Sequence, residues 1–378
     1  MSETLFRTGI IGATGFIGAP YRAEIRACHQ AKMIALCARR KDLLKTAAQE
    51  DGAPFYTQSW EEVITHPEVN FVIVATPDAL HHEAVMACAQ HGKHLLCEKP
   101  VGMNASQARE MMQAFLHSDP PLGHFVPFWT RYVKVFQVAR EMIQSGELGE
   151  IRSTLFRWHN PRPPNMPLTW RDNPELSSAG TIADVGSHAY DTIRWMIGLE
   201  AEKVLAHGQR LTHSKPDLGE INLREAIEKG QQTDTASMPS KPGGHFDYAS
   251  VSCLFSNGAS GLFVLSHAGS VRKFLAPEIE LHGTKASLSA DRYTGKIKLI
   301  RQNQELETLH ELPPTFEFGN RFEQYVFPAL SPMIKGTRSS VPHPTLEDGW
   351  LAQRFTDAAY LSAKDGHCLL YTSPSPRD

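Results

Sequence analysis

The sequence predicts an α/β protein with two domains, the first built on a doubly wound parallel sheet and the second on a mainly antiparallel sheet. Apolar runs alternate with helical patterns through the first third of the chain, which is typical of a parallel sheet. Short segments with alternating apolar residues and turn signals follow, which favours antiparallel strands. The 378 residues suffice for two cores. We therefore expect domains at 1–125 and 126–370.

The first domain opens with an expected strand at 6–11 and a helix at 19–27. Phe71–Ala75 holds five apolar residues without alternation, as in a strand buried on both faces. The remaining expected elements are strands at 33–37 and 94–97, a last strand within 123–128, and helices at 41–50, 59–65, 80–91 and 105–116.

The second domain begins with an expected helix at 133–145, and the chain closes with a helix at about 346–364. Strands are expected at 151–158, 202–210, 248–256, 260–268, 277–283, 286–290 and 296–302. The stretch 212–246 is polar and is expected to be an excursion with a small helix at 220–229, which shapes either the substrate cleft or an interface. We expect residues 371–378 to form a disordered tail.

Composition excludes several classes of protein. The hydrophobic content is 41%, the charged content is 21% and the net charge is −3, so nothing indicates a nucleic-acid partner. No apolar run has the length of a membrane span or a signal peptide, and the six cysteines form no CxxC. We expect a cytoplasmic protein without a membrane partner.

A glycine-rich loop, GATGFIG, follows the first strand and opens the first helix. Glycines there let the backbone approach a pyrophosphate closely at the positive end of a helix. The residues expected to hold a dinucleotide are Gly12, Ala13, Thr14, Gly15, Phe16, Ile17 and Gly18. Where an NAD-binding unit carries an acid at the end of its second strand, this chain has Arg39 and Arg40. Guanidinium groups suit a 2′-phosphate, so NADP is favoured over NAD. The alternative is that both arginines merely begin a solvated helix.

Two further segments narrow the class of enzyme. Residues 75–102 contain Glu98-Lys99-Pro100 after a strand, and residues 180–198 contain Asp184-x-Gly-x-His188. Together with the glycine loop they resemble the Gfo/Idh/MocA oxidoreductase family, and the resemblance extends over nearly the whole chain. It implies a Rossmann domain followed by an α/β domain with an open, mainly antiparallel sheet.

The resemblance also implies roles for individual residues. Lys99 corresponds to a catalytic residue beside the nicotinamide, and Asp184 and His188 to an acidic residue and a proton-transferring histidine. Glu98 corresponds to a position near the nicotinamide ribose, and Thr76, Pro77 and His81 to a segment that lines the cofactor site. Relatives often carry several glycines before the Asp-x-Gly-x-His motif, whereas this chain has Ser177-Ser178-Ala179-Gly180.

The residues themselves fit the same chemistry. Oxidation of a secondary alcohol needs a base for the hydroxyl proton, and histidine is the usual base near neutral pH. Asp184 and His188 are four residues apart, so on one helix they project from the same face. Asp184 then orients His188 or holds a substrate hydroxyl, and Lys99 shares the proton relay.

Aromatic and hydrogen-bonding side chains near these motifs predict a site for a sugar ring, whose C–H faces stack and whose hydroxyls need partners. The candidates for substrate binding are Lys99, Trp129, Arg131, Arg157, His159, Trp170, Arg171, Asp184 and His188. The family often acts on sugars, inositols and related polyols, and several arginines leave an acidic sugar open. The histidines show no HxH or HxxxH spacing, so no metal is expected.

The sequence is consistent with three hypotheses about function. The first is an oxidoreductase that moves a hydride between NAD(P) and a secondary alcohol or ketone of a sugar, inositol or polyol. The second is a glycosidase of the same family that uses nicotinamide transiently, and the third is a non-catalytic NADP-sensing regulator. The resemblance also implies a homo-oligomer, either a dimer or a tetramer.

Overall fold

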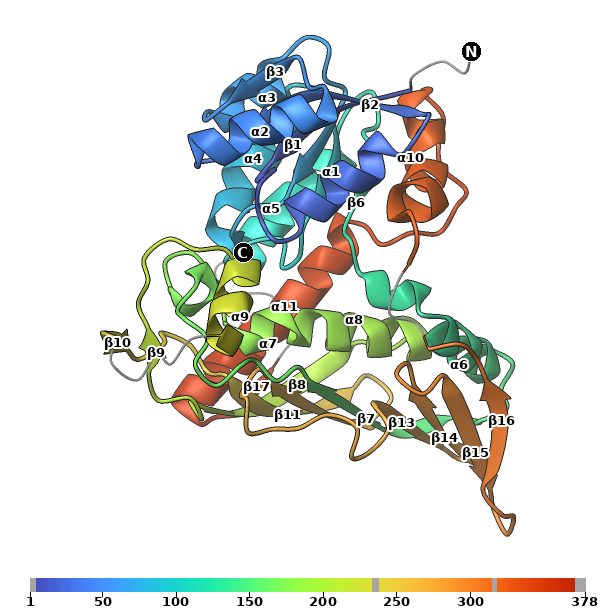
Figure 1. Ribbon diagram of the computed structural model, residues 1–378. Coiled ribbons are helices and arrows are strands. Elements are labelled where there is room, and N and C mark those ends of the chain that lie inside the picture. The colour runs from blue at the N-terminus through green and yellow to red at the C-terminus, as the bar shows by residue number, and fades with distance from the viewer. Residues whose placement is uncertain (1–4, 233–237, 315–317, 371–378) are drawn as a thin grey trace.

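The computed structural model describes residues 5–232, 238–314 and 318–370, so the expectation for 371–378 lies outside the described residues. Two sheets lie one above the other, with the N-terminal sheet at the top of Figure 1 and the C-terminal sheet below it. Helices α6, α7, α8 and α11 lie between the lower sheet and the upper half of the molecule. The predicted fold class is confirmed.

The N-terminal sheet is parallel throughout, with the order β3-β2-β1-β4-β5-β6. Its strands are β1 (Phe6–Ile11), β2 (Ala31–Cys37), β3 (Phe55–Thr57), β4 (Phe71–Val74), β5 (His94–Cys97) and β6 (His124–Phe125), and its helices are α1 (Gly18–Arg26), α2 (Lys41–Asp51), α3 (Trp60–Thr65), α4 (His81–Gln90) and α5 (Ala105–Leu116). The strand order reverses between β1 and β4, and in such sheets a ligand binds at the carboxyl ends of the strands at that point.

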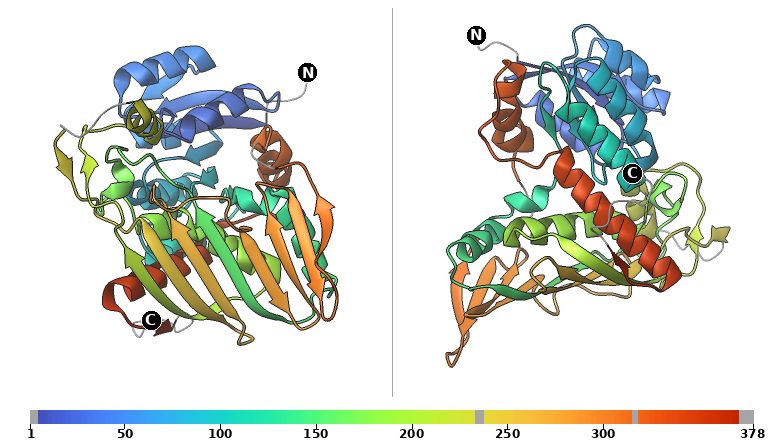
Figure 2. Two further views of the ribbon diagram at one scale, coloured as in Figure 1. Left: turned by 60° about the horizontal axis from the view of Figure 1, so that its bottom comes forward. Right: turned by 180° about the vertical axis from the view of Figure 1, so that it is seen from behind.

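The C-terminal sheet has nine strands in the order β16-β15-β14-β13-β7-β12-β11-β8-β17, and only β7 and β12 run parallel. Figure 2 shows it as a broad open sheet. Its strands are β7 (Ile151–His159), β8 (Ala201–Gln209), β11 (Tyr248–Phe255), β12 (Ser260–Ser266), β13 (Ile279–Gly283), β14 (Ala286–Asp291), β15 (Lys296–Arg301), β16 (Glu307–Glu311) and β17 (Leu369–Leu370), while β9 (Lys215–Pro216) and β10 (Ser240–Lys241) form a separate pair.

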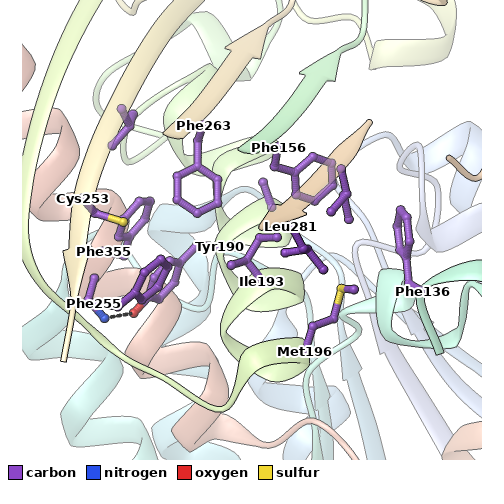
Figure 3. Packing of buried hydrophobic residues seen from close by; sticks show 14 of the residues in the cluster. Phe136, Phe156, Tyr190, Ile193, Met196, Cys253, Phe255, Phe263, Leu281 and Phe355 are labelled. Atoms are coloured by element: carbon purple, nitrogen blue, oxygen red, sulfur yellow. Dashed lines mark hydrogen bonds between the residues drawn. The ribbon is translucent and has the colours of Figure 1, made fainter. Parts of the chain in front are cut away.

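The inner face of this sheet packs on helices. The helices that follow the first sheet along the chain are α6 (Lys134–Gln144), α7 (Thr181–Asp184), α8 (Gly186–Ile197), α9 (Leu223–Gln232), α10 (Phe327–Ile334) and α11 (Leu346–Asp365). Tyr190 of α8 stacks on Phe355 of α11 with ring centroids 4.0 Å apart, and its hydroxyl accepts a hydrogen bond from the Ala201 amide (Figure 3). Phe263 of β12 completes this contact edge-on. The packing fixes α8, whose first turn carries His188.

Several helices and strands are not predicted by the sequence pattern. Strand β3 is three residues long and follows Pro54, and the edge strands β16 and β17 carry too few buried residues to show a pattern. Helix α10 contains Pro332, which lacks an amide donor and argues against a helix. Residues 322–334, expected in the second domain, lie against the first sheet, where Phe327 stacks on Phe6.

Helix α11 lies against both parts of the molecule, because it contacts α5 of the first part and β8 of the second. Its Gly349 allows a close approach, since a Cβ there would lie 2.5 Å from the Val101 side chain. Within the described ranges, the search for a helix long and apolar enough to cross a bilayer finds none.

Candidate active site

A cleft of about 430 Å³ lies between the two parts of the molecule, at the carboxyl ends of the first sheet. One wall is formed by the glycine loop, by the residues after β2, β4 and β5, and by Trp129. The other wall is formed by residues 158–188 of the second part and by the segment 220–223. The cleft is therefore at the place where the reversal of strand order predicts a ligand.

The glycine loop has the shape that a pyrophosphate requires. Gly12 has φ +88°, and a Cβ there would lie 2.4 Å from the Ala75 carbonyl oxygen. A Cβ at Gly18 would lie 2.2 Å from the Gly12 carbonyl oxygen, so helix α1 packs on the loop only with glycine there. Thr14, Gly15, Phe16 and Ile17 face the cleft with Gly12. The bare backbone at the start of α1 fits the phosphates of a dinucleotide.

Arg39 and Arg40 also line the cleft, after the end of β2, but both have partners from the excursion. Arg39 pairs with Glu220 at 3.1 Å, and both side chains are mostly exposed. Arg40 pairs with Glu225 of α9 at 2.8 Å, and about one third of each side chain is exposed. The excursion thus reaches the end of the cleft where the glycine loop and β2 place an adenosine ribose.

Lys99 and Asp184 join the two parts of the molecule across the cleft. The Lys99 ammonium group donates to Asp184 Oδ1 at 2.8 Å and to the Asp184 carbonyl oxygen at 3.0 Å. Helix α7 ends at Asp184 and α8 begins at Gly186, so the two motif residues do not share one uninterrupted helix. The Asp184 carbonyl, which Lys99 and the Ser187 hydroxyl both approach, lies at this interruption.

The second oxygen of the Asp184 carboxylate faces three more basic side chains. His267 Nε2 lies 3.3 Å from Oδ2, Arg171 Nε lies 3.6 Å away and Arg162 Nη2 lies 3.8 Å away. Burial alone would raise the pKa of Asp184, but Lys99 and these neighbours hold it well below its ordinary value. Burial and the nearby arginines lower the pKa of His267 to about 3, so its ring is neutral.

His188 lies in an aromatic pocket beside this pair. Its ring stacks on Trp158 with centroids 5.4 Å apart and meets Phe128 edge-on. Burial and the neighbouring Lys99 lower the pKa of His188 well below 6.5, so the ring is neutral at physiological pH. Among the described residues, none forms a hydrogen bond with His188 Nδ1. A neutral imidazole that lines the cleft can accept a proton.

Glu98 is held by a buried tyrosine that sequence reasoning missed. Tyr21 of α1 donates its hydroxyl proton to Glu98 Oε1, and the Trp129 indole donates to the Tyr21 oxygen at 3.2 Å. The peptide bond between Lys99 and Pro100 is cis. Tyr21 was hidden within an ordinary amphipathic helix, because its partner is 77 residues away in sequence.

The loop before Asp184 is tied to the first part by Asp78, which also lines the cleft and was not predicted. The Ser178 amide and hydroxyl both donate to Asp78 Oδ2, at 2.9 and 3.1 Å. Burial raises the pKa of Asp78 to about 6. Gly180 has φ +56°, and a Cβ there would lie 2.4 Å from that of His245. The Ser178 hydroxyl therefore adds a hydrogen bond that a glycine in this loop could not form.

Six predicted site residues lie outside the described lining of the cleft. Arg131 is buried in ion pairs with Asp191 and Asp348, at 2.5 and 2.7 Å, between helices of the second part. Arg157 pairs with Glu280 of the neighbouring strand, and His159 Nδ1 lies 3.1 Å from the Arg272 carbonyl oxygen. The others support the cleft from behind, namely Ala13, Gly18 and His81.

The other predicted residues come together at the cleft. Those on the side of the first sheet are Gly12, Thr14, Gly15, Phe16, Ile17, Arg39, Arg40, Thr76, Pro77, Glu98, Lys99 and Trp129, and those from the second part are Trp170, Arg171, Asp184 and His188. Residues that sequence reasoning did not assign to the site include Gln58, Trp60 and Glu220. Across the described ranges, no three His, Cys, Asp or Glu side chains gather closely enough to hold a metal ion.

Comparison with curated proteins gives relatives of known activity. Levoglucosan dehydrogenase of Pseudarthrobacter phenanthrenivorans is 32% identical over 161 residues, which are 42% of this chain and 40% of that protein. Myo-inositol 2-dehydrogenase of Thermotoga maritima is 26% identical over 360 residues, which are 95% of this chain and 96% of that protein. The match to the first relative thus spans less than half of its length.

Solved structures share the fold over the whole chain. An oxidoreductase domain protein from Kribbella flavida covers 99% of this chain with a TM-score of 0.81 and 22% identity. Levoglucosan dehydrogenase in complex with NADH and L-sorbose covers 97% with a TM-score of 0.79 and 22% identity.

Family models match both parts. The model of the oxidoreductase family with an NAD-binding Rossmann fold matches residues 6–119, and that of the GFO/IDH/MocA C-terminal domain matches residues 136–289. The chain belongs to the Gfo/Idh/MocA family of oxidoreductases.

Proposed function

We propose that this protein is an NAD(P)-dependent oxidoreductase that interconverts a secondary alcohol and a ketone on a sugar, an inositol or a related polyol. The observation that carries the proposal is the contact of Lys99 with Asp184 beside a neutral His188, next to a loop shaped for a dinucleotide. The names of the dehydrogenases among its relatives support the class of substrate.

Each of the three side chains has a distinct part in this proposal. The bound nicotinamide supplies the hydride acceptor or donor. Lys99 holds the reacting oxygen with its positive charge, and His188 accepts the hydroxyl proton because its ring is neutral. Asp184 orients Lys99 through the 2.8 Å contact and offers an acceptor to a second hydroxyl.

For the coenzyme we propose a preference for NADP. Arg39 and Arg40 line the cleft where a 2′-phosphate would lie, and the exposure of their pairs with Glu220 and Glu225 makes exchange for a phosphate inexpensive. The two glutamates compete with the phosphate, so the preference over NAD is expected to be moderate.

We also propose a cytoplasmic homo-oligomer. The described cysteines are free thiols, which suits a reducing compartment. On the outer face of the open sheet, Leu205, Leu254 and Leu262 are each about 40% exposed or more, on adjacent strands β8, β11 and β12. Apolar side chains on an uncovered sheet face favour burial against a second copy.

Removal of Lys99 or His188 tests the proposed chemistry. Lys99→Ala and His188→Ala are each expected to lower kcat at least about a hundredfold, because each removes a group that acts on the reacting oxygen. The dissociation constant of the coenzyme should change little. The measurement is a panel of sugars and polyols with NAD and NADP, followed by absorbance of the reduced nicotinamide.

His82→Ala is the matched control, since His82 pairs with Glu110 away from the described cleft lining and should leave kcat unchanged. Near-normal turnover in both Lys99→Ala and His188→Ala would contradict the assignment of these residues to the active site. Release of an aglycone from a glycoside without net reduction of the coenzyme would instead support the glycosidase.

The pH dependence of kcat/KM for alcohol oxidation tests the role of His188. Burial, Lys99 and Arg292 lower its pKa, and a proton acceptor must be neutral. We therefore expect kcat/KM to stay level as the pH falls through 6.5 and to decrease only well below it. Arg292→Gln removes one positive charge and should shift the decrease to higher pH, whereas Arg292→Lys keeps the charge and should not. A decrease centred at or above pH 6.5 in the unchanged protein would contradict this role.

Coenzyme preference is tested by binding, measured as quenching of tryptophan fluorescence. Arg40→Gln should weaken the binding of NADPH more than that of NADH, because it removes a partner of the 2′-phosphate. Glu225→Gln should tighten NADPH by about threefold with little effect on NADH, the scale of a partly exposed ion pair. Glu228→Gln, an exposed change on the same helix, is the control. Equal effects of the Arg40 and Glu225 variants on both coenzymes would refute the NADP preference.

A further inference from the structure

Arg171 is a charged side chain of the cleft whose donors are poorly used. Its Nε and Nη1 atoms are buried, and neither forms a hydrogen bond with any residue that the structure describes. The guanidinium lies 4.4 Å over the ring of Trp170, and Nε is 3.6 Å from Asp184 Oδ2, which is too far for a hydrogen bond. A buried guanidinium with unused donors costs free energy until it meets an acceptor.

Several cations share one carboxylate in this part of the cleft. Lys99, Arg162 and Arg171 all lie around the one carboxylate of Asp184, and Arg162 Nη2 is 3.8 Å from it. His188 and His267 are neutral because burial lowers both pKa values. Within 4 Å of the Asp184 carboxylate there are therefore three cations, and Asp78 and Asp172 lie near enough to act electrostatically on Arg171 and Arg162.

The other carboxylates of the cleft have partners of their own. Asp78 accepts two hydrogen bonds from Ser178, and Glu98 accepts the Tyr21 hydroxyl proton. Neither forms a direct ion pair with Arg162 or Arg171 among the described contacts. Neither carboxylate therefore supplies a hydrogen-bond acceptor to the buried donors of Arg171.

The two ends of this cluster offer different chemistry to a ligand. Lys99 occupies Oδ1 of Asp184 and lies beside His188, where the reacting hydroxyl is expected, whereas Arg162 and Arg171 lie at Oδ2. A guanidinium presents parallel donors that match the two oxygens of a carboxylate. Trp158 and Trp170 line the same wall, with His188 stacked on the first ring and Arg171 over the second.

We propose that the substrate is an acidic sugar or polyol, such as a hexuronate or an aldonate. Its carboxylate is bound by Arg171 and Arg162 while its reacting hydroxyl lies at Lys99 and His188. The inference rests on the proposed function, which places the reacting oxygen at Lys99. It adds that an acceptor on the substrate, which is a carboxylate in this proposal, is required to satisfy the buried donors of Arg171.

Pairs of ligands that differ only in charge test this proposal. The probes are D-glucuronate and D-galacturonate, their neutral uronamides, and D-gluconate. With the unchanged protein, at least one acid is expected to have a kcat/KM about tenfold or more above that of its neutral partner, which corresponds to about 1.4 kcal/mol. Binding is measured in parallel by tryptophan fluorescence with the coenzyme-loaded protein, which does not depend on turnover.

Variants of Arg171 test whether this side chain causes the preference for the acid. Arg171→Gln should remove the preference for the acid, mainly through KM, and Arg171→Lys should keep part of it because the charge remains. Arg157→Gln is the matched control, since Arg157 pairs with Glu280 outside the described lining of the cleft and should leave the preference intact. Circular dichroism melting of each variant separates loss of recognition from loss of folding.

The outcomes separate this inference from the proposed function. Tight binding of an acid without oxidation would refute the oxidoreductase and leave carboxylate recognition standing. Oxidation of neutral sugars with no preference for acids, or an acid preference that survives Arg171→Gln, would overturn carboxylate recognition by Arg171. If the neutral partners bind as well as the acids in every pair, the proposal also fails.

Discussion

The buried carboxylate of Asp184 is the constraint on which the rest of the site depends. It can stay ionised away from water only because positive charge surrounds it, with Lys99 at 2.8 Å and two arginines within 4 Å. Those cations come from the segment after β5 of the first part and from residues 160–172 of the second. Charge compensation therefore fixes how the two parts face each other, as well as the position of Lys99. Loss of either partner would leave a buried charge without compensation, so the halves of the cleft are held together where the chemistry is expected.

The sequence predicts much of this arrangement because its signals are local. The alternation of strands and helices specifies the parallel sheet, and Gly12–Gly18 follow β1 directly. Lys99 and Asp184 are 85 residues apart, however, and their contact follows from the family resemblance rather than from periodicity. The expected single helix is also interrupted at Val185, between α7 and α8.

The errors concern charged side chains whose partners are far away in sequence. Arg131 resembles a substrate ligand in the sequence, but its partners Asp191 and Asp348 lie 60 and 217 residues further on. Glu225 is also far in sequence from its partner Arg40, and Tyr21 is far from its partner Glu98, so the sequence predicts neither pair. A charge in isolation carries no information on whether it is already compensated, because compensation depends on the fold. Residue types predict the chemistry of this cleft, but they do not predict which of its cations already have an ion-pair partner in the fold.

The two ends of the cleft differ in how easily they can open. The pairs of Arg39 and Arg40 with the excursion are partly or mostly exposed, and such pairs are worth about 1 kcal/mol or less. Separating Lys99 from Asp184 would instead leave a buried charge without a partner, and the free-energy cost would be several times larger. Exchange of the coenzyme is thus expected to begin with displacement of α9. Leu223 and Ala226 of α9 pack against Met166, which lies in the loop between Arg162 and Arg171. Helix α9 therefore contacts both the arginines at the coenzyme end and the loop that carries Arg162 and Arg171.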